Sequence, residues 1–193
     1  MTDISRILLF MVGCIFTHNV VFDRMLGVHD AGQPRRFETS VIYGVVVCIV
    51  MTLSSVCCWA VQTMMLAPMH YEFLQLIAFS LIVVAVTALV QLCVSKVKPQ
   101  WAETLDNCLM PIAANCAVLG IAIINAEAGY DLLYALLSGI CGGLGFLLAI
   151  VLLAGVYEKL EFAKVPEPFR GMPIAVISAG LIALAFIGFK GIA

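Results

Sequence analysis

The sequence predicts an all-α integral membrane protein with six transmembrane helices, arranged as two inverted three-helix repeats. The composition is 63% hydrophobic and 11% charged over 193 residues, with a mean hydropathy of +1.11, which is too apolar for a soluble domain of this size. Six apolar stretches are long enough to cross about 30 Å of hydrocarbon. The first and fourth stretches carry polar residues in their interior, which favours broken helices there.

The six predicted spans follow one another with only short connections between them. In chain order they are residues 7–28, 41–66, 73–94, 108–124, 132–157 and 173–189. We expect that the first span is not a signal peptide, because Asp3 lies where a signal peptide is basic and the apolar stretch is too long. Asp23 and Arg24 fall inside its last third, so either the helix ends near Phe22 or each charge has a partner on another helix.

The fifth span is rich in glycine. Gly139 and Gly143 form a small-xxx-small pair, which permits close approach of a neighbouring helix. No strand precedes these glycines, so a phosphate-binding loop is excluded. The chain also lacks a basic patch with interleaved aromatic residues, which excludes nucleic-acid binding.

The distribution of basic residues predicts the orientation in the membrane. With six spans, Arg6 and Lys190 share the face of the two termini, and the other eight Lys and Arg residues lie on the opposite face. Cytoplasmic loops collect positive charge, so we expect both termini to face outward. We place this multi-pass protein in the cytoplasmic (inner) membrane of a bacterium or archaeon.

The chain divides into two halves of three spans each, residues 1–95 and 96–193, which form a single membrane domain. An odd number of spans in each half makes the halves inverted with respect to each other. The polar segment at Asn19 in span one and the segment at Asn115 in span four occupy equivalent places. Paired interruptions of this kind mark a site near the membrane midplane, so Asn19 and Asn115 are candidates for lining an ion path.

Cysteine and histidine are the residues that could bind a metal. None of the eight cysteines forms a C-x-x-C pair, and most are expected to be small apolar residues of helices. Cys116 differs because it follows Asn115 in the middle of a span that, with 17 residues, barely crosses the membrane. An iron-sulfur cluster normally takes four protein ligands, so a cluster at Cys116 would have to be shared with a partner.

Several motifs resemble those of one family, the A-type membrane subunits of the Rnf complex, and also their sister subunits in the sodium-translocating NADH:quinone oxidoreductase. The similarity runs over essentially the whole chain. The motifs are Asn115-Cys116-Ala117-Val118-Leu119-Gly120, Met51-Thr52-Leu53-Ser54-Ser55, Val165-Pro166-Glu167-Pro168-Phe169-Arg170-Gly171, Ser178-Ala179-Gly180-Leu181 and Phe186-Ile187-Gly188-Phe189.

This resemblance implies a redox-driven Na⁺ or H⁺ pump that passes electrons from ferredoxin to NAD⁺. It implies a 2Fe-2S cluster shared with a homologous inverted partner, the E-type membrane subunit. The B-, C-, D- and G-type Rnf subunits would complete the complex, and some of these carry the flavins. Cys116 matches the family's ligand in span four.

The family's span-one ligand has no direct match in this chain. Family members show Leu-Gly-x-Cys-Pro there, whereas this chain reads Leu26-Gly27-Val28-His29-Asp30. His29 is the candidate replacement, since imidazole ligation of a 2Fe-2S iron occurs in Rieske centres and raises the potential. Cys14 or Cys108 could instead supply the ligand, or the cluster could be altered.

Two other functions remain open from the residues alone. A secondary transporter of a small solute could be built on the same inverted halves and broken helices. It would be active as an isolated chain and would contain no iron. A purely structural scaffold for other subunits is the third interpretation, and it predicts full turnover without Cys116.

Overall fold

The computed structural model describes residues 3–28, 37–69, 72–97, 112–113, 115–163 and 166–188. Within these ranges all regular secondary structure is helical, which confirms the predicted all-α class. Three helices are long and apolar enough to cross a membrane: Phe37–Leu66, Gln75–Lys96 and Leu132–Leu160. Three shorter apolar helices, Ser5–Thr17, Cys116–Glu127 and Met172–Ile187, account for the remaining predicted spans.

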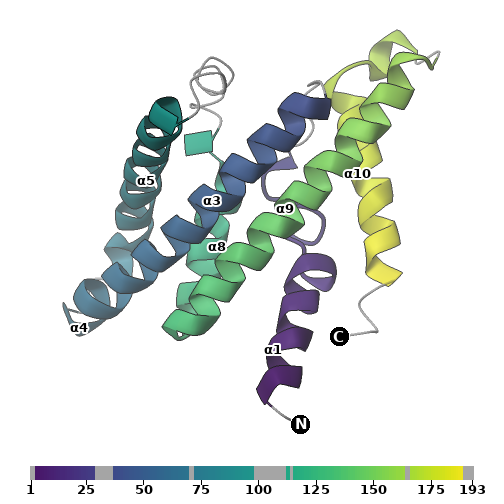
Figure 1. Ribbon diagram of the computed structural model, residues 1–193. Helices are drawn as coiled ribbons and strands as arrows, with labels where there is room; N and C mark the ends of the chain where they lie inside the picture. Colours follow the sequence, from purple (N-terminus) through teal and green to yellow (C-terminus); the bar gives the residue numbers. More distant parts are fainter. Residues whose placement is uncertain are drawn as a thin grey trace.

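Each predicted span corresponds to a helix, but the first and fourth contain helix over only part of their length. The elements are α1 (Asp3–Val12), η1 (Gly13–Thr17), α3 (Phe37–Val61), η2 (Gln62–Leu66), α4 (Ala67–Met69), η3 (Glu72–Leu74), α5 (Gln75–Val97), α8 (Cys116–Glu127), α9 (Leu132–Glu161), η4 (Glu167–Phe169) and α10 (Met172–Ile187). The starts of α1 and α9 and the ends of α3 and α10 all lie toward the lower part of Figure 1. The two ends of the described chain therefore lie toward the same side of the bundle, as an even number of spans requires.

Helices α3 and α9 form the centre of the bundle and lie side by side (Figure 1). Their close approach depends on Gly139 and Gly143 of α9, as the small-xxx-small pattern predicts. A Cβ atom added at Gly143 would lie 2.8 Å from the Cα atom of Cys48 on α3, and one at Gly139 would lie 3.0 Å from the Cα atom of Thr52. The missing side chain is therefore required at Gly143 and leaves room for the tight contact at Gly139.

The outer helices make corresponding contacts in the two halves of the chain. Helix α5 packs on α3 and α8, whereas α10 packs on α9 and η1. Helix α8 packs on α3, and η1 packs on α9. In this comparison α3 corresponds to α9, α5 to α10 and α8 to η1. Each contact in one half then has a counterpart in the other, which is the pattern expected of two structural repeats.

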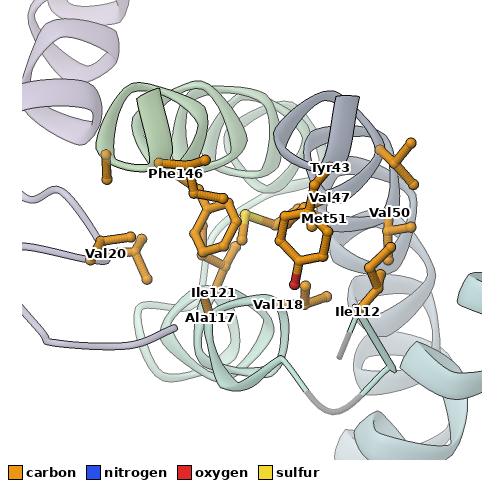
Figure 2. Close-up of a cluster of buried hydrophobic side chains, with 14 of the residues drawn as sticks. Val20, Tyr43, Val47, Val50, Met51, Ile112, Ala117, Val118, Ile121 and Phe146 are labelled. Atoms are coloured by element: carbon orange, nitrogen blue, oxygen red, sulfur yellow. The ribbon is translucent and has the colours of Figure 1, made fainter. Parts of the chain in front are cut away.

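The buried core joins residues from both halves. Figure 2 shows Tyr43 and Met51 of α3, Val118 and Ile121 of α8, and Phe146 of α9 directed toward a common centre. By contrast, only 22% of the most apolar window of α5 is buried, compared with 50% for α3 and 56% for α9. The exposed apolar side of α5 is a surface that lipid or another protein would cover.

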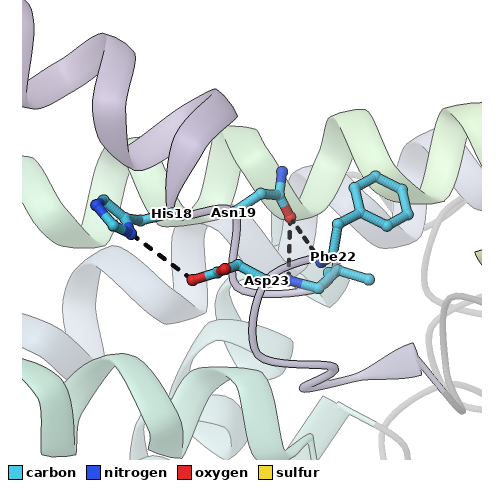
Figure 3. Close-up of polar contacts among 5 residues, drawn as sticks. His18, Asn19, Phe22 and Asp23 are labelled. Atoms are coloured by element: carbon cyan, nitrogen blue, oxygen red, sulfur yellow. Dashed lines mark hydrogen bonds and ion pairs between the residues drawn. The ribbon is translucent and has the colours of Figure 1, made fainter. Parts of the chain in front are cut away.

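The break in span one comes earlier than the sequence predicts. The helical path stops after η1, and residues 18–27 form successive turns although Val20, Val21 and Phe22 are buried. Asp23 does have a partner, because its carboxylate lies 3.6 Å from Nδ1 of His18 (Figure 3). The helix therefore ends well before Phe22, and the apolar residues that follow are packed without being helical.

Candidate functional site

The start of α8 is the polar break predicted in span four. Asn115 is the N-cap residue of α8, with extended backbone angles (φ −69°, ψ 110°), and its side-chain oxygen accepts a hydrogen bond of 2.9 Å from the amide of Ala117. Asparagine is among the preferred residues at this position because its oxygen satisfies an amide that has no partner within the helix. Asn115 is 1% exposed, and its Nδ2 donates to the hydroxyl of Tyr43 at 3.5 Å.

Cys116 is the first residue of α8, and its side chain is exposed on the surface of this chain. Its sulfur accepts a hydrogen bond of 3.0 Å from the backbone N–H of Gly27. Gly27 belongs to the irregular segment that follows the break in span one, so the two broken spans meet at this sulfur. An exposed sulfur beside a backbone donor is available to a ligand at the surface of this chain.

Gly27 can be replaced by no other residue without strain. Its φ of +73° lies in the left-handed region, which side chains disfavour. A Cβ atom here would lie 2.7 Å from the ring of Phe146, 3.0 Å from Oδ1 of Asn115 and 3.2 Å from Cβ of Ala117. The Gly27 backbone is thus packed directly against the start of α8, which holds its N–H toward Cys116.

Asn19 performs in span one the task that Asn115 performs in span four. Its Oδ1 accepts hydrogen bonds from the amides of Val21 at 3.0 Å and Phe22 at 3.4 Å (Figure 3). Its Nδ2 donates to the carbonyls of Ile15 and Gly145, both at 2.9 Å. Each asparagine accepts from the amide two residues later, and each therefore stabilises a helix break at an equivalent place in its half.

The other candidate ligands predicted from the sequence are His29, Cys108 and Cys14. His29 and Cys108 lie outside the described residues. Cys14, in η1, is half-buried and lines a cavity of about 520 Å³ together with Tyr130 and Ser138. Cys116 does not line this cavity, and its sulfur instead contacts Gly27. Within the described ranges no group of three or more His, Cys, Asp and Glu side chains could hold a metal ion.

Gly27 and Tyr43 contribute to this site, although the sequence alone does not single them out. The Gly27–Cys116 hydrogen bond joins residues 89 positions apart, and the contact of Asn115 with Tyr43 joins residues 72 positions apart. The one signal that points to Gly27 is its place in the Leu26-Gly27 pair of the motif in span one.

Comparison with known proteins assigns the chain to a family. The sequence model of the family described as "Rnf-Nqr subunit, membrane protein" matches residues 7–193. The chain is 40% identical over 189 residues to the A-type subunit of the ion-translocating oxidoreductase complex of Syntrophotalea carbinolica, covering 97% of this chain and 98% of that protein.

Two further relatives agree with this match. The chain is 41% identical to the A-type subunit of the Na(+)-translocating ferredoxin:NAD(+) oxidoreductase complex of Acetobacterium woodii, covering 96% and 97% of the two chains. It is 39% identical to the A-type subunit of the ion-translocating oxidoreductase complex of Escherichia coli K12, covering 96% of each chain. The family resemblance predicted from the motifs is confirmed, and the chain belongs to the Rnf-Nqr family of membrane subunits.

Proposed function

We propose that this chain is a membrane electron-transfer subunit of a redox-driven Na⁺ or H⁺ pump, in a bacterial or archaeal cytoplasmic membrane. The observation that carries the proposal is the exposed sulfur of Cys116, held by a backbone N–H where two broken spans meet. The names of the relatives support it, since one is a subunit of a Na⁺-translocating ferredoxin:NAD⁺ oxidoreductase. The chain would act within that kind of complex and would have no activity alone.

The group bound at Cys116 would be a 2Fe-2S cluster shared with a homologous, inverted partner, the E-type subunit. Such a cluster takes four protein ligands, so this chain and its partner would each supply two. Cys116 fits one of these positions, because its sulfur is exposed and adjoins the chain segment that leads to His29. We propose His29 as the second ligand from this chain. When bound, the cluster supplies one-electron transfer across the subunit interface.

The residues around Cys116 fix the sulfur in place. The Gly27 N–H stabilises negative charge on the sulfur, and hydrogen bonds of this kind tune the potential of a cluster. Asn115 and Tyr43 lie behind it and hold the start of α8. These contacts come from three different spans, so the sulfur position depends on the packing of both halves.

Coupling to ion transport has a simple electrostatic basis. Negative charge added within a low-dielectric membrane is unfavourable unless a cation compensates it. Moving one elementary charge across the membrane is worth about 2.3 kcal/mol per 100 mV, which sets the scale of the work. Asn19 and Asn115 remain predicted members of the ion path, although in this structure their side-chain oxygens bond to backbone amides.

Replacement of Cys116 tests the proposal. In the purified complex, Cys116→Ala is expected to lower the iron and acid-labile sulfide content and to abolish one reduced-state EPR signal. The matched control is Cys57→Ala, which removes another exposed cysteine on α3. Subunit stoichiometry, measured by size-exclusion chromatography and gel analysis, shows whether each complex still assembles. A complete EPR signal and full turnover in Cys116→Ala would reject the electron-transfer role and favour a scaffold.

His29 can be tested through the reduction potential. His29→Cys creates the thiolate that the family motif has at this place, so it should keep the EPR signal and lower its midpoint potential. His29→Ala should remove the signal. An unchanged potential in His29→Cys, together with an unchanged signal in His29→Ala, would show that the second ligand is another residue.

A further inference from the structure

A second polar site lies at the other end of α8, in a cavity of about 290 Å³. The cavity is bounded by the end of α3 with η2, by α5, by the end of α8 and by the turn before α9. The indole Nε1 of Trp59 donates to the carbonyl of Tyr130 at 3.0 Å, which joins the end of α3 to this turn. By the expected orientation of the chain, the cavity lies toward the outer face of the membrane.

Asn125 lines this cavity and has a buried side-chain oxygen without a hydrogen-bond partner among the described residues. The residue is 4% exposed and lines the cavity, and its Nδ2 donates to Oγ of Ser55 at 2.7 Å. The Ser55 hydroxyl in turn donates to the carbonyl of Ala135 at 2.6 Å. A serine has one proton and a backbone carbonyl can only accept, so Ser55 must accept from Asn125. This fixes the orientation of the amide and leaves Oδ1 of Asn125 without a donor among the described residues.

Gln62 adds a second oxygen of the same kind. It lines the same cavity from η2, and its Oε1 is also buried without a donor in the described part of the chain. Ser54 has the third such atom, but it does not line this cavity. Two of the three unpaired buried side-chain atoms in the described ranges therefore belong to residues of one cavity. An acceptor buried without a partner is unfavourable, so the arrangement calls for a donor or a cation.

Asp131 supplies a negative charge at the rim. It is the N-cap residue of α9, but its side chain makes no capping hydrogen bond there, and it is exposed. The described residues that line the cavity include no Lys or Arg. The residues that line the cavity thus carry two amide oxygens and one carboxylate, and oxygen atoms are the ligands that hard cations prefer. A single carboxylate matches a monovalent ion, and the volume leaves room for several waters of about 30 Å³ each.

We propose that this cavity binds a hydrated monovalent alkali cation through Asn125, Gln62 and Asp131. The inference builds on the proposed function and names a site on its ion path. Asn125 lies nine positions after Cys116 on the same helix, which at 1.5 Å per residue is about 14 Å along its axis. The site thus lies between Cys116 and the expected outer face, where an exported ion would leave.

Sodium binding to the purified complex tests the site independently of electron transfer. Isothermal titration with NaCl, against choline chloride as blank, is done on the wild-type complex and three variants. Asp131→Asn removes the charge with little change of shape, and Gln62→Met removes the amide oxygen. Each is expected to weaken one class of Na⁺ sites by about tenfold or more, because ligand charge and ligand number set the affinity. Glu127→Gln is the matched control, since Glu127 is an exposed acid at the same end of α8 that does not line the cavity.

The outcomes separate this site from the proposed function. Equal Na⁺ affinity in all four complexes would overturn the site and would mean that the cavity does not bind Na⁺. Weaker binding in Glu127→Gln, equal to that in Asp131→Asn, would also overturn it, because the effect would then be one of general surface charge. If Cys116→Ala keeps full turnover while Asp131→Asn loses Na⁺ affinity, the electron-transfer role fails and the cation site stands. If Na⁺ affinity is unchanged but Cys116→Ala loses its EPR signal, the reverse holds.

Discussion

At the scale of single residues, Gly27 links the two broken spans. Its N–H reaches the sulfur of Cys116, and its φ of +73° and close neighbours leave no room for a side chain. The other left-handed glycine near α8 is Gly129, at φ +62°, where an added Cβ atom would meet nothing within 4 Å. Both glycines have a backbone in the left-handed region, but only an added side chain at Gly27 would collide with neighbouring atoms.

Gly27→Ala is therefore expected to destabilise the chain more than Gly129→Ala. Both substitutions carry the left-handed strain of about 1–2 kcal/mol. Only Gly27→Ala adds overpacking, which typically costs a further 1–3 kcal/mol or so. The measurement is the temperature at which half of the purified protein in detergent is lost from the monodisperse peak. Equal temperatures for the two variants would show that the crowding at Phe146 and Asn115 is relieved without cost.

The sequence indicates Cys116 and Asn115 because polar residues within an apolar span are conspicuous. It gives no indication of Tyr43 and points to Gly27 only through the Leu26-Gly27 pair, since a glycine or a tyrosine in an apolar segment has many structural uses. Their role depends on contacts between residues 89 and 72 positions apart, and a single sequence holds no record of such distances. The orientation of the Asn125 amide is equally out of reach, because it follows from the proton of Ser55.

At the scale of elements, helix lengths are predictable and helix breaks are only partly so. The thickness of hydrocarbon sets the length of an apolar run, and α3, α5, α9 and α10 begin and end within a few residues of the predicted spans. Span one is different, because Val20, Val21 and Phe22 are as apolar as any helical segment but form turns. An apolar composition predicts that a segment is buried, but it does not predict the backbone conformation of that segment.

The contact between α3 and α9 gives a prediction at this scale. Gly143→Ala should push the two helices apart, because the new Cβ atom would lie 2.8 Å from the Cα atom of Cys48. A loss of about 1–3 kcal/mol is expected from overpacking of this kind. Gly155→Ala on the same helix is the control, since nothing lies within 4 Å of that position and alanine favours helix. Thermal stability in detergent should fall for the first variant and hold or rise for the second.

At the scale of the whole molecule, the direction of the chain in the membrane decides on which side each site opens. The excess of Lys and Arg in alternate loops predicts that the α8–α9 turn faces outward and that η4 faces the cytoplasm. The two segments are joined by α9, which is long enough to span the membrane. They must therefore lie on opposite faces.

A labelling experiment on intact cells tests this orientation. In a background without other cysteines, Gly129→Cys should react with a membrane-impermeant maleimide. Glu167→Cys should react only after the cells are permeabilised. Both positions are exposed in this structure, so lack of labelling would reflect the membrane and not burial in the chain. The reverse pattern would invert the orientation and place the cavity at Asn125 on the cytoplasmic side.

The short helix α8 joins the site at Cys116 to the cavity at Asn125. Cys116 is its first residue, and Asn125 lies in its last turn. The peptide dipoles of a helix add to a partial positive charge at its N-terminus and a partial negative charge at its C-terminus. In the proposed mechanism, α8 would therefore present its electropositive end to an electron at Cys116 and its electronegative end to a cation beside Asn125, so that both charges would be stabilised by the dipole of one helix.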